Sequence, residues 1–108
     1  MRKAALTLFE KLKPMAHRTT NYVCKFPESE VGQIGLMSIK EIAESVGLSP
    51  GYTRQLLREL CAHRYIALCT TGGITSVLVN YKVHYRGNEP DAFLRLVFRD
   101  WNPTEVTV

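Results

Sequence analysis

The chain has 108 residues and carries 14 Lys or Arg against 10 Asp or Glu, which gives a formal net charge of +4 and a pI near 9.1. Its 45% hydrophobic and 22% charged residues exclude a disordered, collagen-like or disulfide-scaffold chain. No apolar stretch approaches the roughly 18 residues that a membrane span needs, and Glu10 and Lys11 interrupt the N-terminal apolar run too early for a signal peptide. We therefore expect a single cytoplasmic domain over residues 1–108.

Three cysteines make an odd number without a C-x-x-C spacing, which fits neither a disulfide framework nor a zinc finger. We expect reduced and mostly buried thiols. The three histidines also lack the spacing of a metal motif. A metal site with the ligands Cys61, His63, Cys69 and His84 is conceivable, although the spacing of these residues matches no metal-binding motif. We expect no metal and no cofactor.

The charge is unevenly distributed along the chain. Residues 1–25 carry a net +5, residues 26–49 a net −3, residues 50–86 a net +4 and the remaining residues a net −2. Two basic blocks separated by an acidic block can make one face of a folded domain positive. The alternative is a solvated surface of mixed sign.

Residues 2–13 are predicted to form an amphipathic helix with a basic outer face. Apolar residues recur with helical spacing, and Pro14 marks the end of the helix. The apolar positions are Ala5, Leu8, Phe9 and Leu12. Residues 15–37 follow no regular pattern, and they predict loop with a short strand at Tyr22–Phe26.

Residues 38–62 contain the boundary signals of two helices. Ser38 followed by Glu41 is a capping box, in which each side chain accepts a hydrogen bond from a backbone N–H at the start of a helix. Gly47 suits the left-handed residue that ends this helix. Ser49 and Pro50 then suit the N-cap and the first position of a second helix.

Each of these two helices has one apolar stripe, so they must cross in order to bury both stripes. The first stripe is Ile39, Ile42, Ala43 and Val46, and the second is Thr53, Leu56, Leu57 and Leu60. Leu48 lies in the turn and is expected to fill the core beneath it. The pattern predicts a helix-turn-helix over residues 38–62.

The spacing of Ala43, Gly47, Thr53 and Leu56 resembles the helix-turn-helix signature. Residues 39–49 are similar to the DNA-binding domains of cyclic-AMP-receptor-type and related winged-helix regulators. In those proteins the small residue permits close helix packing, the glycine makes the turn and the later two residues pack between the helices. The chain departs from their pattern at Pro50 and Gly51, at the start of the second helix, where the family often has charged base-reading residues.

Residues 65–85 predict a β-hairpin directly after the second helix. Tyr65–Thr71 and Ile74–Tyr85 are rich in β-branched and aromatic residues, and the Gly72-Gly73 pair between them is typical of a two-residue turn. Such a hairpin is the wing of a winged helix, and it extends the resemblance over residues 34–85.

The two-residue turn also predicts the strand register. Facing pairs on the core side of the hairpin are Leu68 with Val77 and Ile66 with Val79, and the same face is expected to continue through Tyr81 and Val83. The predicted fold is therefore α+β and mainly α: a winged helix-turn-helix with added N- and C-terminal helices.

Residues 90–101 predict a last helix that is more apolar than one core stripe requires. Its apolar residues are Phe93, Leu94, Val97, Phe98 and Trp101. This surplus can pack on the N-terminal helix, or it can pair with the same helix of a second subunit. We favour a homodimer, because dimers are the commonest oligomers.

A recognition helix presents to the major groove the face opposite its apolar stripe. Glutamine can bond bidentately to adenine and arginine to guanine. The expected base-reading residues are therefore Gln55, Arg54 and Arg58, with Gly51 allowing a close backbone approach. The alternative for the two arginines is ordinary solvated helix charge, which includes an ion pair of either arginine with Glu59 or Glu44.

Phosphate contacts are expected from the start of this helix and from the wing. Ser49 and Tyr52 lie where the helix dipole favours an anion. The wing tip offers hydroxyls and backbone amides without charge, and consists of Thr70, Thr71, Gly72 and Gly73. Further candidate cations are Arg64 and Lys82 beside the hairpin, and Arg2, Lys3 and Arg18 near the N-terminus.

These features predict a sequence-specific binder of double-stranded DNA that acts at the nucleoid as a homodimeric transcriptional regulator or repressor. Since no phosphate loop, nucleophile motif or metal motif is present in the sequence, we expect neither an enzyme nor a small-molecule ligand. One alternative is a plasmid or phage protein that binds a centromere or replication origin. Another is a winged helix that makes only protein contacts.

Overall fold

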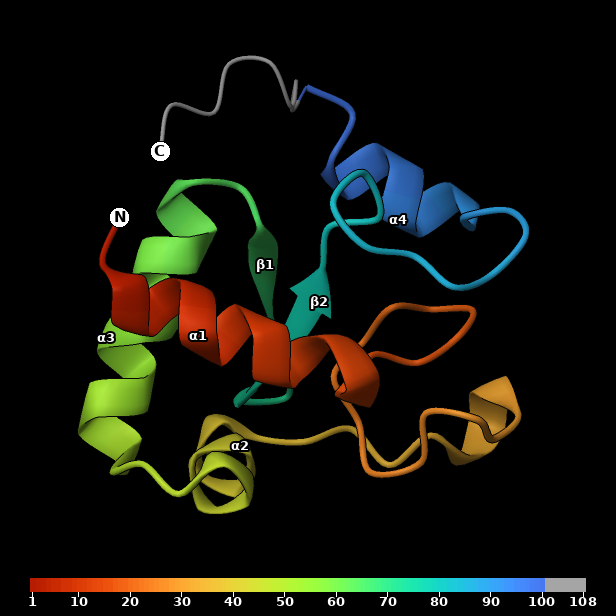
Figure 1. Cartoon of the computed structure of the whole chain (residues 1–108). Helices are drawn as coiled ribbons and strands as arrows, with labels where there is room; N and C mark the ends of the chain where they lie inside the picture. Colours follow the sequence, from red (N-terminus) through yellow and green to blue (C-terminus); the bar gives the residue numbers. More distant parts are fainter. Residues whose placement is uncertain (101–108) are drawn as a thin grey trace.

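A computed structural model describes residues 1–100, which form four α-helices and one two-stranded antiparallel sheet (Figure 1). The helices are α1 (Lys3–Leu12), α2 (Ile39–Val46), α3 (Pro50–Ala62) and α4 (Ala92–Val97). The strands are β1 (Ile66–Thr71) and β2 (Ile74–Val79), and short 3-10 turns lie at Lys13–Met15 and Val31–Gln33. A helix-turn-helix followed by a hairpin confirms the predicted fold class. No helix within this part of the chain is long and apolar enough to cross a membrane.

The predicted signals for the two central helices are confirmed. The Ser38 hydroxyl accepts the Glu41 N–H at 3.2 Å, and the Glu41 carboxylate accepts the Ser38 N–H at 3.1 Å. Gly47 ends α2 with a φ of 75°, in the left-handed region that favours glycine. Ser49 then caps α3 by accepting the Tyr52 N–H at 3.2 Å. Local chemistry thus determines where both helices begin and how sharply the chain turns between them.

The hairpin has the predicted register, with Leu68 facing Val77 and Ile66 facing Val79. The predicted length of its second strand is wrong, because β2 ends at Val79 and the chain then turns instead of continuing to Tyr85. Tyr81 and Val83 therefore do not extend the core face of the strand. They pack against two different clusters, Tyr81 with α4 and Val83 with the main core.

Two apolar clusters cover the two faces of the hairpin. The main core lies between the hairpin, α1, α2 and α3, and it contains the predicted α1 stripe together with the α3 leucines. The second cluster contains Leu78, which projects from the opposite face of β2, with Leu94 and Phe98 from the α4 segment. Both faces of β2 are consequently buried, which explains why four consecutive residues of this strand are shielded from solvent.

The strand predicted at Tyr22–Phe26 is reduced to isolated bridges. Val23 donates its N–H to the Val77 carbonyl at 2.8 Å, and Asn21 accepts the Val79 N–H at 2.9 Å, so the segment lies along β2. The chain then leaves β2, because Lys25 and Phe26 bond instead to the backbone of the following loop. This third, short partner protects the edge of the hairpin.

The C-terminal helix is shorter than predicted and packs differently. It spans Ala92–Val97 instead of residues 90–101, with Asp91 as its N-cap. Leu94 and Phe98 are fully buried against the chain's own hairpin, so they are not available for the predicted dimer contact. The outer face of the hairpin needs this cover, since Leu78 projects from it. Trp101, also predicted for dimerisation, lies outside the described residues.

Asn80 joins the end of α3 to the end of the wing. Its side-chain amide donates to the Arg64 carbonyl at 2.7 Å, and its side-chain oxygen accepts the Lys82 N–H at 2.9 Å. Its backbone N–H donates to the Tyr65 carbonyl at 2.9 Å. A fully buried side chain therefore satisfies backbone groups on both sides of this joint.

Replacing this amide should destabilise the protein. Asn80→Ala leaves two partly buried backbone groups without their side-chain partner, and we expect the free energy of unfolding in urea to fall by about 1–3 kcal/mol. Asn88→Ala, at an exposed asparagine, should change it by less than about 0.5 kcal/mol. Equal effects of the two substitutions would contradict this role of Asn80.

Candidate nucleic-acid interface

The side chains of α3 divide into a buried stripe and three outward columns. Thr53, Leu56, Leu57 and Leu60 are fully buried, as predicted. At 100° per residue, the face opposite this stripe carries Gly51, Gln55, Arg58 and Ala62, all of which are exposed. Small residues at both ends of this central column leave Gln55 and Arg58 as its only long polar side chains, so α3 can approach another surface closely.

Arg54 forms the column that faces the wing. An open groove of about 270 Å³ lies between α2, α3 and the wing tip, and Arg54 lines it with Ser38, Ile39 and Gly73–Thr75. Figure 1 shows the hairpin turn at the same end of the molecule as α2. The structure therefore brings together an arginine of α3, the start of α2 and the tip of the wing.

Tyr52 and Glu59 form the column that faces α1. The Glu59 carboxylate accepts hydrogen bonds from the backbone N–H of Arg2 and from its guanidinium Nε, the latter at 2.7 Å. The hydrogen bond from the Arg2 backbone is the largest cause that holds the pKa of Glu59 below its ordinary value, and the bond from the guanidinium is the second. The same guanidinium lies 5.9 Å from the centre of the Tyr52 ring. Arg2 thus neutralises the one carboxylate on the outward face of α3.

Arg54 and Arg58 make no ion pair within residues 1–100. Neither arginine forms the alternative ion pair, since Glu59 is bound to Arg2 and Glu44 has no ion pair within residues 1–100. Ordinary solvated helix charge remains the alternative for both. Two uncompensated guanidinium groups and one amide, Gln55, remain on the solvent face of α3. Such groups can form bidentate hydrogen bonds to the edges of guanine and adenine.

The negative charge of Glu41, in the first turn of α2, is balanced by a lysine of the preceding loop. Lys25 forms a 2.7 Å ion pair with Glu41, and this hydrogen-bonded pairing lowers the pKa of the Glu41 carboxyl. The capping hydrogen bond to the Ser38 N–H acts in the same direction. Glu41 remains ionised at neutral pH and is held by its two partners.

The remaining predicted contact residues are placed in two groups. Ser49 and Tyr52 lie at the exposed start of α3, where the Ser49 hydroxyl already serves as the helix cap. The wing tip is exposed at Thr70, Thr71, Gly72 and Gly73, and the two glycines have φ values of 60° and 80°, as a type I′ turn requires. The Thr70 hydroxyl is hydrogen-bonded to that of Thr75 at 3.0 Å.

Arg64 and Lys82 lie at the other end of the hairpin from the wing tip. Six-residue strands place them about 20 Å from the turn. The Arg64 guanidinium donates to the Val97 carbonyl at 3.3 Å, and the Lys82 ammonium donates to the Arg99 carbonyl at 3.2 Å. Their cations therefore hold the end of the α4 segment, and the structure does not place them beside the other candidate phosphate contacts.

Residues 35–67 match the family described as winged helix-turn-helix DNA-binding. This match covers α2, α3 and the start of the wing, the same elements that carry the exposed arginines. The chain contains a DNA-binding winged helix-turn-helix. Searches of curated proteins and of solved structures found no match to the chain.

Sequence reasoning missed several residues of the interface. Ser38, Ile39, Ile74 and Thr75 line the groove beside Arg54, but their importance depends on how the wing folds back toward α2. No short-range signal indicates the contact between Arg2 and Glu59, which are 57 positions apart. The conceivable metal set is not assembled, since residues 1–100 contain no group of three ligating side chains that could hold a metal.

Removing the Glu59 carboxylate should strengthen DNA binding. Glu59→Gln eliminates a negative charge beside the exposed face of α3 and releases the charge of Arg2. We expect tighter binding at low salt, and a plot of log affinity against log salt concentration that is steeper by about 0.9 for one added phosphate contact. Fluorescence anisotropy with labelled duplex DNA measures both quantities.

The matched control is Glu89→Gln. It also releases an arginine, Arg95, from an ion pair of 3.1 Å, but it does so beside α4. This control should leave the affinity and the salt dependence nearly unchanged. If Glu59→Gln binds no better than Glu89→Gln, then the Arg2 and Glu59 pair does not lie at the DNA interface.

Proposed function

We propose that this winged helix binds a specific double-stranded DNA sequence and acts as a small transcriptional regulator or repressor at the nucleoid. The observation that carries the proposal is the exposed face of α3, on which Arg54, Gln55 and Arg58 have no competing carboxylate. In this proposal α3 enters the major groove, and Gln55 and Arg58 contact base edges from its central column. Binding alone performs this function, so no catalytic group is required.

The wing supports a second set of contacts. Arg54 was predicted to read bases, but it lines the groove between α3 and the wing tip. We therefore assign it a contact to the phosphate backbone at the edge of the groove that α3 occupies. The wing tip adds hydroxyl and amide donors from Thr71, Gly72 and Gly73. Ser49 and Tyr52 contact phosphate at the start of α3, and Gly51 lets its backbone approach DNA.

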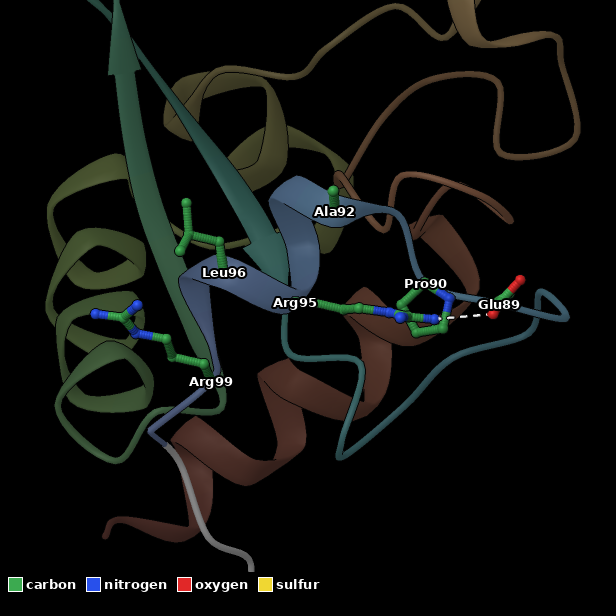
Figure 2. Close-up of a pocket in the computed structure, with 6 residues that line it drawn as sticks. All are labelled: Glu89, Pro90, Ala92, Arg95, Leu96 and Arg99. Carbon is green, nitrogen blue, oxygen red and sulfur yellow. Dashed lines mark hydrogen bonds and ion pairs between the residues drawn. The ribbon is translucent and has the colours of Figure 1, made fainter.

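We further propose that two copies pair through the outer face of α4. Phe93 and Leu96 are 49% and 59% exposed and lie three residues apart, so they are adjacent on this face. Figure 2 shows that Leu96 and Arg99 project on one side of the helix, while Arg95 reaches the other way toward Glu89. A two-fold interface centred on Phe93 and Leu96 would leave the solvent face of α3 and the wing tip accessible to DNA. This is because α4 lies at the end of the hairpin away from the wing tip (Figure 1).

Sequence-specific reading by Gln55 is tested by substitution. The binding site is first selected from random duplex DNA. Gln55→Ala should then weaken binding to the selected sequence by about 1–3 kcal/mol and barely change binding to unrelated DNA. Arg54→Ala should weaken binding to all sequences alike and reduce the salt slope by about 1.

Gln33→Ala, at an exposed glutamine outside α3, is the control and should leave binding unchanged. A Gln55→Ala variant that loses affinity equally on every duplex would refute base reading by this residue. Absence of DNA binding at low salt would favour a winged helix that makes only protein contacts. Cooperative spreading over repeated sites would instead assign the protein to partition or replication.

The α4 interface is tested by analytical ultracentrifugation. Leu96→Glu should convert a dimer into a monomer without unfolding, because this side chain is mostly exposed within one chain. Val31→Glu is the matched control, since Val31 is 58% exposed but belongs to a different surface. A wild-type monomer at micromolar concentration that still protects a symmetric site in DNA would contradict the proposed dimer.

A further inference from the structure

A second groove lies between α1 and the helix-turn-helix, on the other side of α3 from the wing. It has a volume of about 410 Å³. One wall is made by Lys3, Ala4, Thr7, Leu8 and Lys11 of α1, and the other by Leu48, Tyr52 and Leu56. The volume falls within the range of about 300–1,000 Å³ that is typical of sites for small molecules.

The floor of this groove is apolar. Leu8 and Leu56 are buried in the main core, and the partly buried Ala4 and Leu48 pack against the same cluster. Ala4 and Thr7 have short side chains, and this leaves space between α1 and the turn that precedes α3. An apolar molecule placed there would be removed from water along its length.

The rim of the groove is cationic. Lys3 and Lys11 are exposed and lie eight positions apart on α1, which places them about 12 Å from each other along the helix axis. No residue that lines the groove is acidic. Carboxylates nearby on the two helices are already occupied, since Glu59 binds Arg2 and Glu10 forms a 2.8 Å ion pair with Lys13.

We propose that this groove binds a small amphipathic anion, such as an aromatic or short-chain carboxylate. The apolar body lies on the floor between α1 and Leu48, and the carboxylate is bound by a lysine at the rim. Tyr52, whose ring forms part of the wall, adds a hydroxyl group that can hydrogen-bond the anion. Charge complementarity selects the class of ligand, because the rim carries two ammonium groups without a carboxylate to balance them.

Occupancy of the groove is expected to alter DNA binding. This consequence rests on the proposed DNA-binding function, whereas binding of the anion does not. Leu48, Tyr52 and Leu56 belong to the turn and to α3, so a ligand in the groove contacts the helix that carries the proposed DNA-reading face. Tyr52 also lies at the start of the DNA-reading helix, where an anion in the groove competes with phosphate.

The test uses naphthoate as the anionic probe and naphthamide as its neutral counterpart. Binding to the full chain is followed by NMR amide shifts and by calorimetry in the absence of DNA. We expect saturable one-to-one binding of naphthoate, with shifts confined to α1 and residues 48–56. We expect naphthamide to bind roughly two- to fivefold more weakly, as loss of an exposed charge pair implies.

Two kinds of variant distinguish binding at this groove from nonspecific binding of the probe to the protein surface. Thr7→Phe fills the groove from an exposed helix position and should abolish saturable binding, whereas Thr7→Ser should retain it. Lys3→Gln combined with Lys11→Gln should reduce naphthoate binding to the level of naphthamide. Lys40→Gln, at an exposed lysine on α2 outside the groove, should have no effect.

Several results would overturn the proposal. These are equal binding of the neutral probe, insensitivity to Thr7→Phe, and a self-association of the chain that Thr7→Phe removes, which would assign the groove to a second copy. If naphthoate binds as expected but the chain binds no DNA, the site stands and the proposed function fails. If naphthoate does not bind but duplex DNA does, only the site is refuted.

Discussion

Burial of one stripe of α3 is the constraint on which the rest of the structure depends. Thr53, Leu56, Leu57 and Leu60 are fully shielded by α1, α2 and the hairpin. Because a helix has a fixed angular spacing, this burial forces the opposite face into solvent, and that face carries Gln55 and Arg58. Arg54 is turned toward the wing, and Tyr52 and Glu59 toward α1. Core packing and the exposure of these polar side chains are therefore two consequences of the same helix orientation.

Features that depend on neighbouring residues could be predicted from the sequence. The Ser38 capping box, the left-handed Gly47 and the hairpin register through Gly72-Gly73 are all confirmed, because each is decided within a few residues. Features that depend on distant residues could not be predicted. The bond from Arg2 to Glu59 spans 57 positions. The burial of Phe98 depends on Leu78, which projects from the face of β2 opposite the main core and lies 20 positions away.

The positions of the charges in space also change what the net charge means. Part of the positive charge of residues 1–25 is neutralised within the chain, because Arg2, Lys13 and Lys25 each form an ion pair with a glutamate. Arg86 pairs with Glu28 of the acidic block in the same way. The positive charge that remains uncompensated includes Arg54 and Arg58 on the solvent face of α3, and Lys3 and Lys11 above the apolar groove. A modest total of +4 is thus resolved into two cationic surfaces on either side of α3.

We expect DNA to contact the outward face of α3 and the wing tip. Amide NMR spectra recorded during titration with a selected DNA duplex test it most directly, because they report on every element at once. The structure predicts that the largest shifts lie in residues 49–62 and 71–75, with α4 nearly unaffected. Shifts concentrated in α4 or in residues 26–36, with α3 unperturbed, would contradict the account.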